Sequence, residues 1–235
     1  MLLIQSVFNS LGAWTVLAWG QQHVESGLAS VLNSTSPVFV FLITALLTRH
    51  ERIGRFRLAG ACLGIAGVVL IVGPGALTGL GLHLGGQLAV ITGAILYAGA
   101  AIYGKRFNSL PATVTAAATM IWASIFLVPA SLVLDQPWAI TPSTPTILAT
   151  LALSVFCTAI ALLIYFRLLR TLGSIGVASQ SYLRAGIGVL LGSLLLGKSI
   201  SPPVLAGILC TLVGVAIINL PPSFWQASTS PSSKY

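Results

Sequence analysis

Long apolar runs follow one another along almost the whole chain, and few charges interrupt them. Of the 235 residues, 56% are hydrophobic and only 6% are charged, whereas roughly a quarter of the residues in a soluble domain are charged. A transmembrane helix needs about 20 mostly apolar residues. With a mean hydropathy of +1.00, a soluble fold is excluded. The sequence predicts an all-α integral membrane protein that has the lipid bilayer as its surroundings.

Eight segments are long and apolar enough to be predicted as spanning helices. They comprise residues 2–20, 27–48, 56–73, 86–104, 112–134, 147–166, 174–196 and 204–220. The connectors between them are too short to form a soluble domain. Residues 221–235 are rich in Ser and Pro, a composition typical of a disordered tail.

The basic residues fall on one side of the membrane if all eight segments cross it. On that side lie Arg49, Arg52, Arg55, Arg57, Lys105, Arg106, Arg167, Arg170 and Lys234, and on the other side only Lys198 is basic. Because Lys and Arg are enriched in cytoplasmic loops, we expect an inner-membrane protein with both termini in the cytoplasm. We attribute the net charge of +8 to this enrichment of Lys and Arg in cytoplasmic loops. The scattered basic pairs form no continuous stripe for a nucleic acid.

The reactive side chains show no catalytic or metal-binding pattern. Cys62, Cys157 and Cys210 lie inside apolar runs without metal-ligand spacing, and we interpret them as packing residues. His50 and Glu51 are neighbours, but they lie in an Arg-rich loop where a salt bridge is the ordinary explanation. An intramembrane enzyme needs a positioned set of such groups. We therefore expect no metal, no cofactor and no enzyme activity.

A shift of 147 residues aligns one part of the chain with another. It places Leu58, Ala59, Gly60, Gly67, Val68 and Ile71 on Leu205, Ala206, Gly207, Gly214, Val215 and Ile218. This shift spans five predicted helices, an odd number, so the two copies would cross the membrane in opposite directions. Inverted repeats are typical of secondary transporters. Chance similarity between apolar helices is the alternative explanation.

One charged side chain lies near the middle of a predicted span. Arg184 is expected to face the bundle interior or a cavity, because a charge at the bilayer centre costs about 2.5–3.5 kcal/mol on insertion scales. Gln180 and Ser181 share its helical face. These residues are candidates for substrate binding, with Arg184 donating to a substrate carboxylate. The alternative is that Arg184 caps backbone carbonyls near Gly186 and Gly188.

Further polar residues lie on other predicted spans. Asn33 and Ser34 align with Gln180 and Ser181 under the same shift and precede Pro37. Pro37 removes a backbone donor and should kink its helix, either as part of a gate or as a static bend. Gln5 and Asn9 are four residues apart, so they either line the cavity or form hydrogen bonds between helices. We add Asn33, Ser34, Gln5 and Asn9 to the candidate substrate-binding residues.

Two sets of short motifs follow one another along the chain. The first set comprises SGLASVLNSTSPVFV at 26–40, HERI at 50–53 and GVVL at 67–70. The second comprises SYLRAGIGVLLGSLLLG at 181–197, followed by Gly207 and Gly214. Together these stretches resemble the EamA-like transporters of the drug/metabolite transporter superfamily. The resemblance implies ten helices in two inverted five-helix repeats. It also implies alternating-access transport of small metabolites, often amino acids, across a bacterial inner membrane.

The chain departs from this pattern in three ways. Only three helices of the first repeat are expected, in residues 1–75, before five of the second in residues 82–220, an incomplete 3+5 bundle. Lys198 stands where relatives usually carry Glu, and Ala185 stands where many carry a Pro. The leading hypothesis is an exporter of small metabolites. The alternative is a non-transporting scaffold, subunit or truncated remnant, and a homodimer is one way to complete the wall of the pathway.

Overall fold

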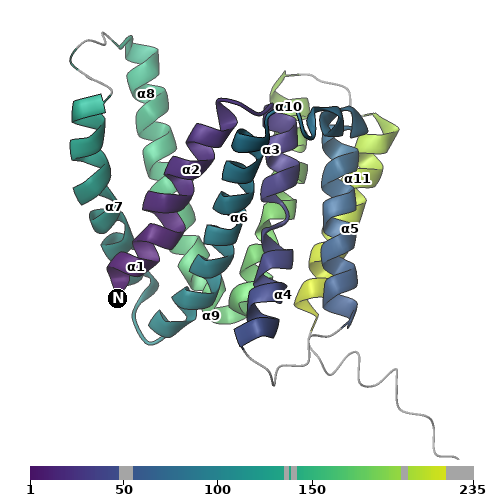
Figure 1. The fold of residues 1–235 in the computed structure, drawn as a ribbon, viewed down its shortest axis with the longest axis horizontal. Coiled ribbons are helices and arrows are strands. Elements are labelled where there is room, and N and C mark those ends of the chain that lie inside the picture. Colours follow the sequence, from purple (N-terminus) through teal and green to yellow (C-terminus); the bar gives the residue numbers. More distant parts are fainter. Residues whose placement is uncertain (48–54, 135–137, 139–141, 197–200, 221–235) are drawn as a thin grey trace, which may run out of the picture.

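The computed structural model describes residues 1–47, 55–134, 138, 142–196 and 201–220. Within these ranges the chain is helical and contains no strand, so the all-α prediction is confirmed. The helices stand side by side in a broad bundle, with α7 and α8 at one edge and α5 and α11 at the other (Figure 1). The predicted tail, 221–235, lies outside the described residues. So do Arg49, Arg52, Glu51, Asp135, Lys198 and Lys234.

The bounds of the elements follow the predicted spans closely. In chain order they are α1 (Leu2–Ser6), the π-helical η1 (Val7–Leu11), α2 (Gly12–Gln21), α3 (Ser26–Asn33), α4 (Ser36–Leu47), α5 (Arg55–Val72), the 3₁₀ segment η2 (Pro74–Gly79), α6 (Leu84–Gly104), the 3₁₀ turn η3 (Lys105–Phe107), α7 (Ala112–Leu134), α8 (Thr144–Ala152), the π-helical η5 (Leu153–Ile160), α9 (Ala161–Ala178), α10 (Gln180–Leu196) and α11 (Pro202–Asn219).

Six of the described helices are long and apolar enough to cross a membrane. The apolar helix at Phe56–Val72 is slightly shorter, and α10 has 17 residues. The last two also coincide with predicted spans. The chain is therefore a multi-pass membrane protein.

The sixth predicted span is longer in the structure than in the sequence-based prediction. The continuous helix begins at Thr144 and passes through residues 167–172, which we had expected to form a connector. Arg167 and Arg170 therefore lie on the end of a helix, where long basic side chains can extend toward the headgroups. The helix is interrupted at Gly173, with φ 73° and ψ −177°. The seventh span begins directly after it, as predicted.

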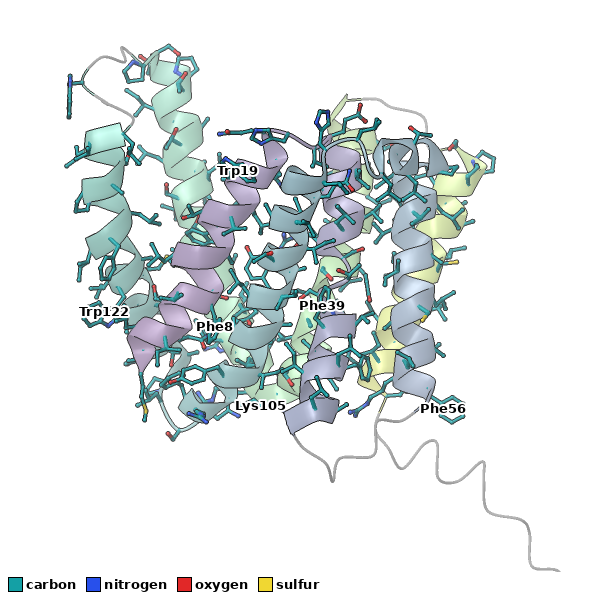
Figure 2. All side chains as sticks on the ribbon, viewed as in Figure 1. Phe8, Trp19, Phe39, Phe56, Lys105 and Trp122 are labelled. Carbon is teal, nitrogen blue, oxygen red and sulfur yellow. The ribbon has the colours of Figure 1, made fainter. Side chains whose placement is uncertain are left out.

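The basic residues gather at one end of the bundle. Arg57 lies near Thr171 and Leu172, with which it lines a small cavity. An ideal Cβ at Gly173 would lie 3.7 Å from Cε of Lys105. The N-terminus and Lys105 are at this same end, and Trp19 lies toward the other (Figures 1 and 2). The predicted sorting of the described basic residues therefore holds.

Helices α5 and α11 pack against each other more extensively than any other pair of elements. Glycines face glycines along their contact. An ideal Cβ at Gly60 would lie 2.9 Å from the carbonyl oxygen of Gly214, and one at Gly67 would lie 2.7 Å from that of Gly207. Small residues allow the close approach of helix backbones that membrane bundles use.

Candidate functional site

Two spans are interrupted at corresponding places in the bundle. Helix α3 ends at Asn33 and α4 begins at Ser36, while α9 ends at Ala178 and α10 begins at Gln180. Short polar side chains satisfy the backbone at both breaks. The Oγ atom of Ser34 donates to the Val31 carbonyl at 2.6 Å, and that of Ser179 donates to the Gly176 carbonyl at 2.7 Å.

The expected disturbance around Pro37 is present, but the helix break begins three residues before it. Pro37 is the second residue of α4, a position in the first turn where a missing backbone N–H is tolerated. The helix therefore restarts at Ser36, rather than bending at Pro37. Its proposed role in gating stays a prediction.

Two other spans carry π-helical segments. These are η1, Val7–Leu11, and η5, Leu153–Ile160. Adding 147 to residues 7–11 gives 154–158, which lie inside η5, so the repeat relates the two irregular segments as well as the glycines. Pi-bulges occur frequently at functional sites because they change the direction of side chains on a helix.

The breaks and the π-helical segments surround one polar cavity of about 170 Å³. Its lining contains amide, hydroxyl, aromatic and guanidinium groups. The lining residues are Asn9, Trp14, Asn33, Ser36, Tyr97, Ala101, Cys157, Thr158, Ala161, Leu162, Tyr165, Ala178, Gln180, Ser181 and Arg184. This volume suits a small metabolite, since the pockets that bind drug-sized ligands measure roughly 300–1,000 Å³.

The structure brings five of the seven candidate substrate-binding residues to this cavity. Arg184, Gln180 and Ser181 come from α10, Asn33 from the end of α3, and Asn9 from η1. Arg184 is exposed and close enough to Tyr97 for electrostatic interaction. Among the described residues, none forms a hydrogen bond or ion pair with its guanidinium, so no bond to the backbone near Gly186 or Gly188 is seen there.

Asn33 contributes an unpaired acceptor. Its Oδ1 atom is buried and has no hydrogen-bond partner among the described residues. Leaving a buried polar atom unpaired costs about 1–3 kcal/mol. A native structure therefore needs a reason for such an atom, and a ligand that supplies a donor is one.

Gln5 and Ser34 do not line the cavity. Gln5 has no exposed surface, and its Nε2 donates to the Ala100 carbonyl at 3.2 Å, which is the alternative use of an interhelical hydrogen bond. The π-helical η1 begins at Val7, between Gln5 and Asn9, so two residues that are four positions apart do not share a face as they would in a regular α-helix. Ser34 is 1% exposed and is occupied by its bond to the backbone.

Several cavity residues could not be picked out from the sequence. Trp14, Tyr97, Thr158 and Tyr165 are single residues within apolar runs, where packing is the ordinary use of such side chains, and π-helical segments have no simple sequence pattern. Cys157, expected to pack in the core, instead is exposed and lines the cavity. The repeat, which aligns Cys157 with Ser10 next to the candidate Asn9, is the one sequence signal that could have indicated it.

Polytopic helices, paired breaks and a polar cavity at those breaks together define the class of secondary-transporter-like membrane proteins. The chain matches the EamA-like transporter family over residues 1–73 and 84–220. It belongs to this family.

Similar proteins come from several bacteria. The "Uncharacterized inner membrane transporter YedA" of Escherichia coli K12 is 28% identical over 199 residues, which cover 85% of this chain and 63% of that protein. The "Probable terminal-alkyne amino-acid exporter" of Streptantibioticus cattleyicolor is 26% identical over 216 residues, which cover 90% and 70% of the two chains. This chain thus spans under two thirds of the length of the Escherichia coli relative.

A solved crystal structure has the same fold. It superimposes with a TM-score of 0.79 at 21% identity, covering 92% of this chain and 76% of the other.

Proposed function

We propose that the protein is a secondary transporter of small metabolites, such as amino acids or related amphipathic compounds, that works by alternating access. The observation that carries this proposal is the polar cavity at the two helix breaks. Asn33 from the first copy faces it together with Gln180, Ser181 and Arg184 from the second. Substrate sites at the interface of inverted repeats, built from discontinuous helices, are the usual arrangement in secondary transporters.

The cavity supplies the groups that such a site needs. The guanidinium of Arg184 can bond a carboxylate with two parallel hydrogen bonds, and the amides of Asn9, Asn33 and Gln180 can fix the orientation of a polar substrate. Aromatic rings from Trp14, Tyr97 and Tyr165 complete the lining. The similarity to the Streptantibioticus protein described as a probable terminal-alkyne amino-acid exporter supports substrates of this size and polarity.

We further propose that the basic end of the bundle faces the cytoplasm, so that the N-terminus lies there in the inner membrane. The clustering of Arg57 and Lys105 with residues 171–173 supports this orientation through the positive-inside rule. Export is then movement from that end to the end that carries Trp19. We also propose that residues 1–75 form a partial first repeat and residues 82–220 the second repeat. Two copies of the chain would pair as a homodimer.

Loaded cells test the proposed transport. Cells expressing the protein are preloaded with a mixture of radiolabelled amino acids and related acids, and the efflux of each compound is followed. We expect faster efflux of a subset than in cells without the protein. Gln180→Ala should reduce that efflux about 10-fold, whereas Gln21→Ala, which removes an exposed amide at the end of α2, should leave it unchanged. Folded protein that accelerates no compound would favour the scaffold alternative.

A further inference from the structure

The charge inside the cavity is not balanced by the residues that line it. Arg184 is the one charged side chain of the lining, and the others are amides, hydroxyls, a thiol and apolar or aromatic groups. Of the described residues, none pairs with its guanidinium. Glu25, the carboxylate that the structure describes, lies in a different cavity with His23 and His83. Arginine remains positively charged in proteins, so the empty cavity holds a full positive charge.

This charge is tolerated in the open cavity, where the exposed guanidinium can be hydrated. Alternating access requires the protein to pass through a state in which the cavity is closed to both sides. In that state water no longer compensates the charge, and an unpaired charge at membrane depth is unfavourable. If the insertion penalty for a buried cation applies, the occluded state with an unpaired Arg184 is populated about 100-fold less than the same state with the charge neutralised.

A bound anion removes the penalty, because it leaves the closed cavity with no net charge. A zwitterion does so less well, since its carboxylate pairs with Arg184 while its ammonium adds a new positive charge. For that ammonium the lining offers no carboxylate, only neutral amide and hydroxyl oxygens and the π faces of three aromatic rings, which attract a cation less strongly than an ion pair does. A small ligand of net charge −1 is therefore the best complement.

The unpaired Oδ1 of Asn33 adds a second requirement. It accepts a hydrogen bond and lies in the same lining as Arg184, so the ligand should also carry a neutral O–H or N–H donor. A 2-hydroxy acid or an N-acylated amino acid meets both requirements. A simple fatty acid offers the charge without the donor.

We infer that this protein exchanges small monoanionic carboxylates that carry a neutral hydrogen-bond donor. It switches between its inward-open and outward-open states only when such an anion neutralises Arg184. The inference rests on the proposed function and specifies its substrate and coupling. The empty protein is held open by its own charge. Each outward movement of an anion is therefore matched by an inward movement of another.

The charge selectivity of the cavity can be measured before any substrate is known. Cys62→Ala and Cys210→Ala leave Cys157 as the only thiol, inside the cavity. The rates at which Cys157 reacts with an anionic and with a cationic methanethiosulfonate reagent are measured. Each rate is divided by the rate at which the same reagent reacts with free 2-mercaptoethanol, to remove the intrinsic difference in reactivity between the reagents. We expect the anionic reagent to be favoured about 10-fold or more, because Arg184 attracts it. Arg184→Lys should keep the preference and Arg184→Gln should abolish it. Equal preferences in the parent and in Arg184→Gln would overturn the inference.

Exchange is tested in proteoliposomes in isotonic sucrose with a zwitterionic buffer, so that no bulk anion neutralises Arg184. Two matched series serve as probes: L-lactate, L-alanine and L-lactamide, and the corresponding L-phenyllactate, L-phenylalanine and L-phenyllactamide. Uptake of a labelled hydroxy acid should be about 100-fold faster into vesicles loaded with the same acid than into vesicles loaded with its amide. The hydroxy acid should also exceed the zwitterion, and the amide should not be transported.

The outcomes separate the two proposals. Uptake that proceeds equally with and without an internal acid, or that favours L-alanine and L-phenylalanine, overturns the inference and leaves transport standing. If no probe crosses the membrane under any loading, the proposed function fails for these acids, and the thiol measurement still decides whether the cavity selects anions. Arg184→Lys is the matched control for folding, because it keeps the charge and loses only the planar pair of donors.

Discussion

Gly67 and Gly207 contact each other reciprocally across the α5–α11 interface. An ideal Cβ on either residue would lie 2.7 Å from the carbonyl oxygen of the other. Gly60 and Gly214 have the same relationship, at 2.9 and 2.7 Å. The 147-residue shift places Gly60 on Gly207 and Gly67 on Gly214. Gly60 therefore contacts the counterpart of Gly67, and Gly67 contacts the counterpart of Gly60. This is the contact pattern of a two-fold axis between two inverted copies.

The reciprocity predicts that alanine at Gly67 and alanine at Gly207 are similarly damaging. Each added methyl group meets backbone rather than a flexible side chain, so we expect each substitution to lower the free energy of unfolding by about 1–3 kcal/mol. Thermal unfolding of the purified protein in detergent measures the effect. Gly75→Ala is the control, since a Cβ there has no atom within 4 Å. Full stability of Gly67→Ala would contradict the close packing described above.

A second prediction separates binding from stability at Asn33 and Gln5, two amides whose side-chain oxygens are buried. Asn33→Ala removes an unpaired Oδ1, so stability should change by less than about 0.5 kcal/mol while transport falls about 10-fold. Gln5→Ala removes the Nε2 bond to the Ala100 carbonyl and leaves a void, so it should cost about 2–3 kcal/mol. Unfolding and efflux are measured on the same preparations. A strongly destabilised Asn33→Ala protein would show that Asn33 is structural.

The backbone conformation of Gly173 predicts that replacing this residue by either Ala or Asn lowers the stability of the protein. A backbone with φ 73° and ψ −177° lies in a region that is essentially restricted to glycine, at a cost of about 1–3 kcal/mol for other residues. Gly173→Ala should therefore destabilise the protein even though there is room for a methyl group. Gly173→Asn should not rescue it, because Asn tolerates the left-handed helical region and not this one. Equal stability of the Asn variant and the parent would refute the assigned backbone conformation.

The approximate bounds of most spans were predictable because hydrophobicity alone selects membrane helices. The same holds for Arg184, since a charge within an apolar span must face inward. Gln5 was misplaced for a physical reason. A polar residue within an apolar span is expected both for an amide that lines a cavity and for one that bonds between helices, so the sequence does not distinguish the two. The π-helical η1 that redirects Asn9 is not encoded by a simple repeat of residue types.

The cavity's other walls depend on packing between helices that are distant in sequence. Cys157 and Thr158 reach the cavity through η5, and Tyr97 reaches it from α6. A thiol or a tyrosine within an apolar span is as often a packing residue as a cavity residue. Before the structure is seen, the repeat connects only Cys157 and Thr158 to another cavity segment, because it aligns residues 154–158 with residues 7–11.

The last prediction concerns the orientation of the chain in the membrane. Gln22 and Asn108 are both exposed in connectors, Gln22 after α2 and Asn108 beside Lys105 and Arg106 after α6. Each is replaced by cysteine in a protein whose three native cysteines are alanine, and intact cells are treated with a membrane-impermeant maleimide. The positive-inside rule predicts that Gln22→Cys is labelled at once and Asn108→Cys only after the membrane is permeabilised. The reverse pattern would place the basic end outside, and equal labelling of both in intact cells would contradict a single orientation.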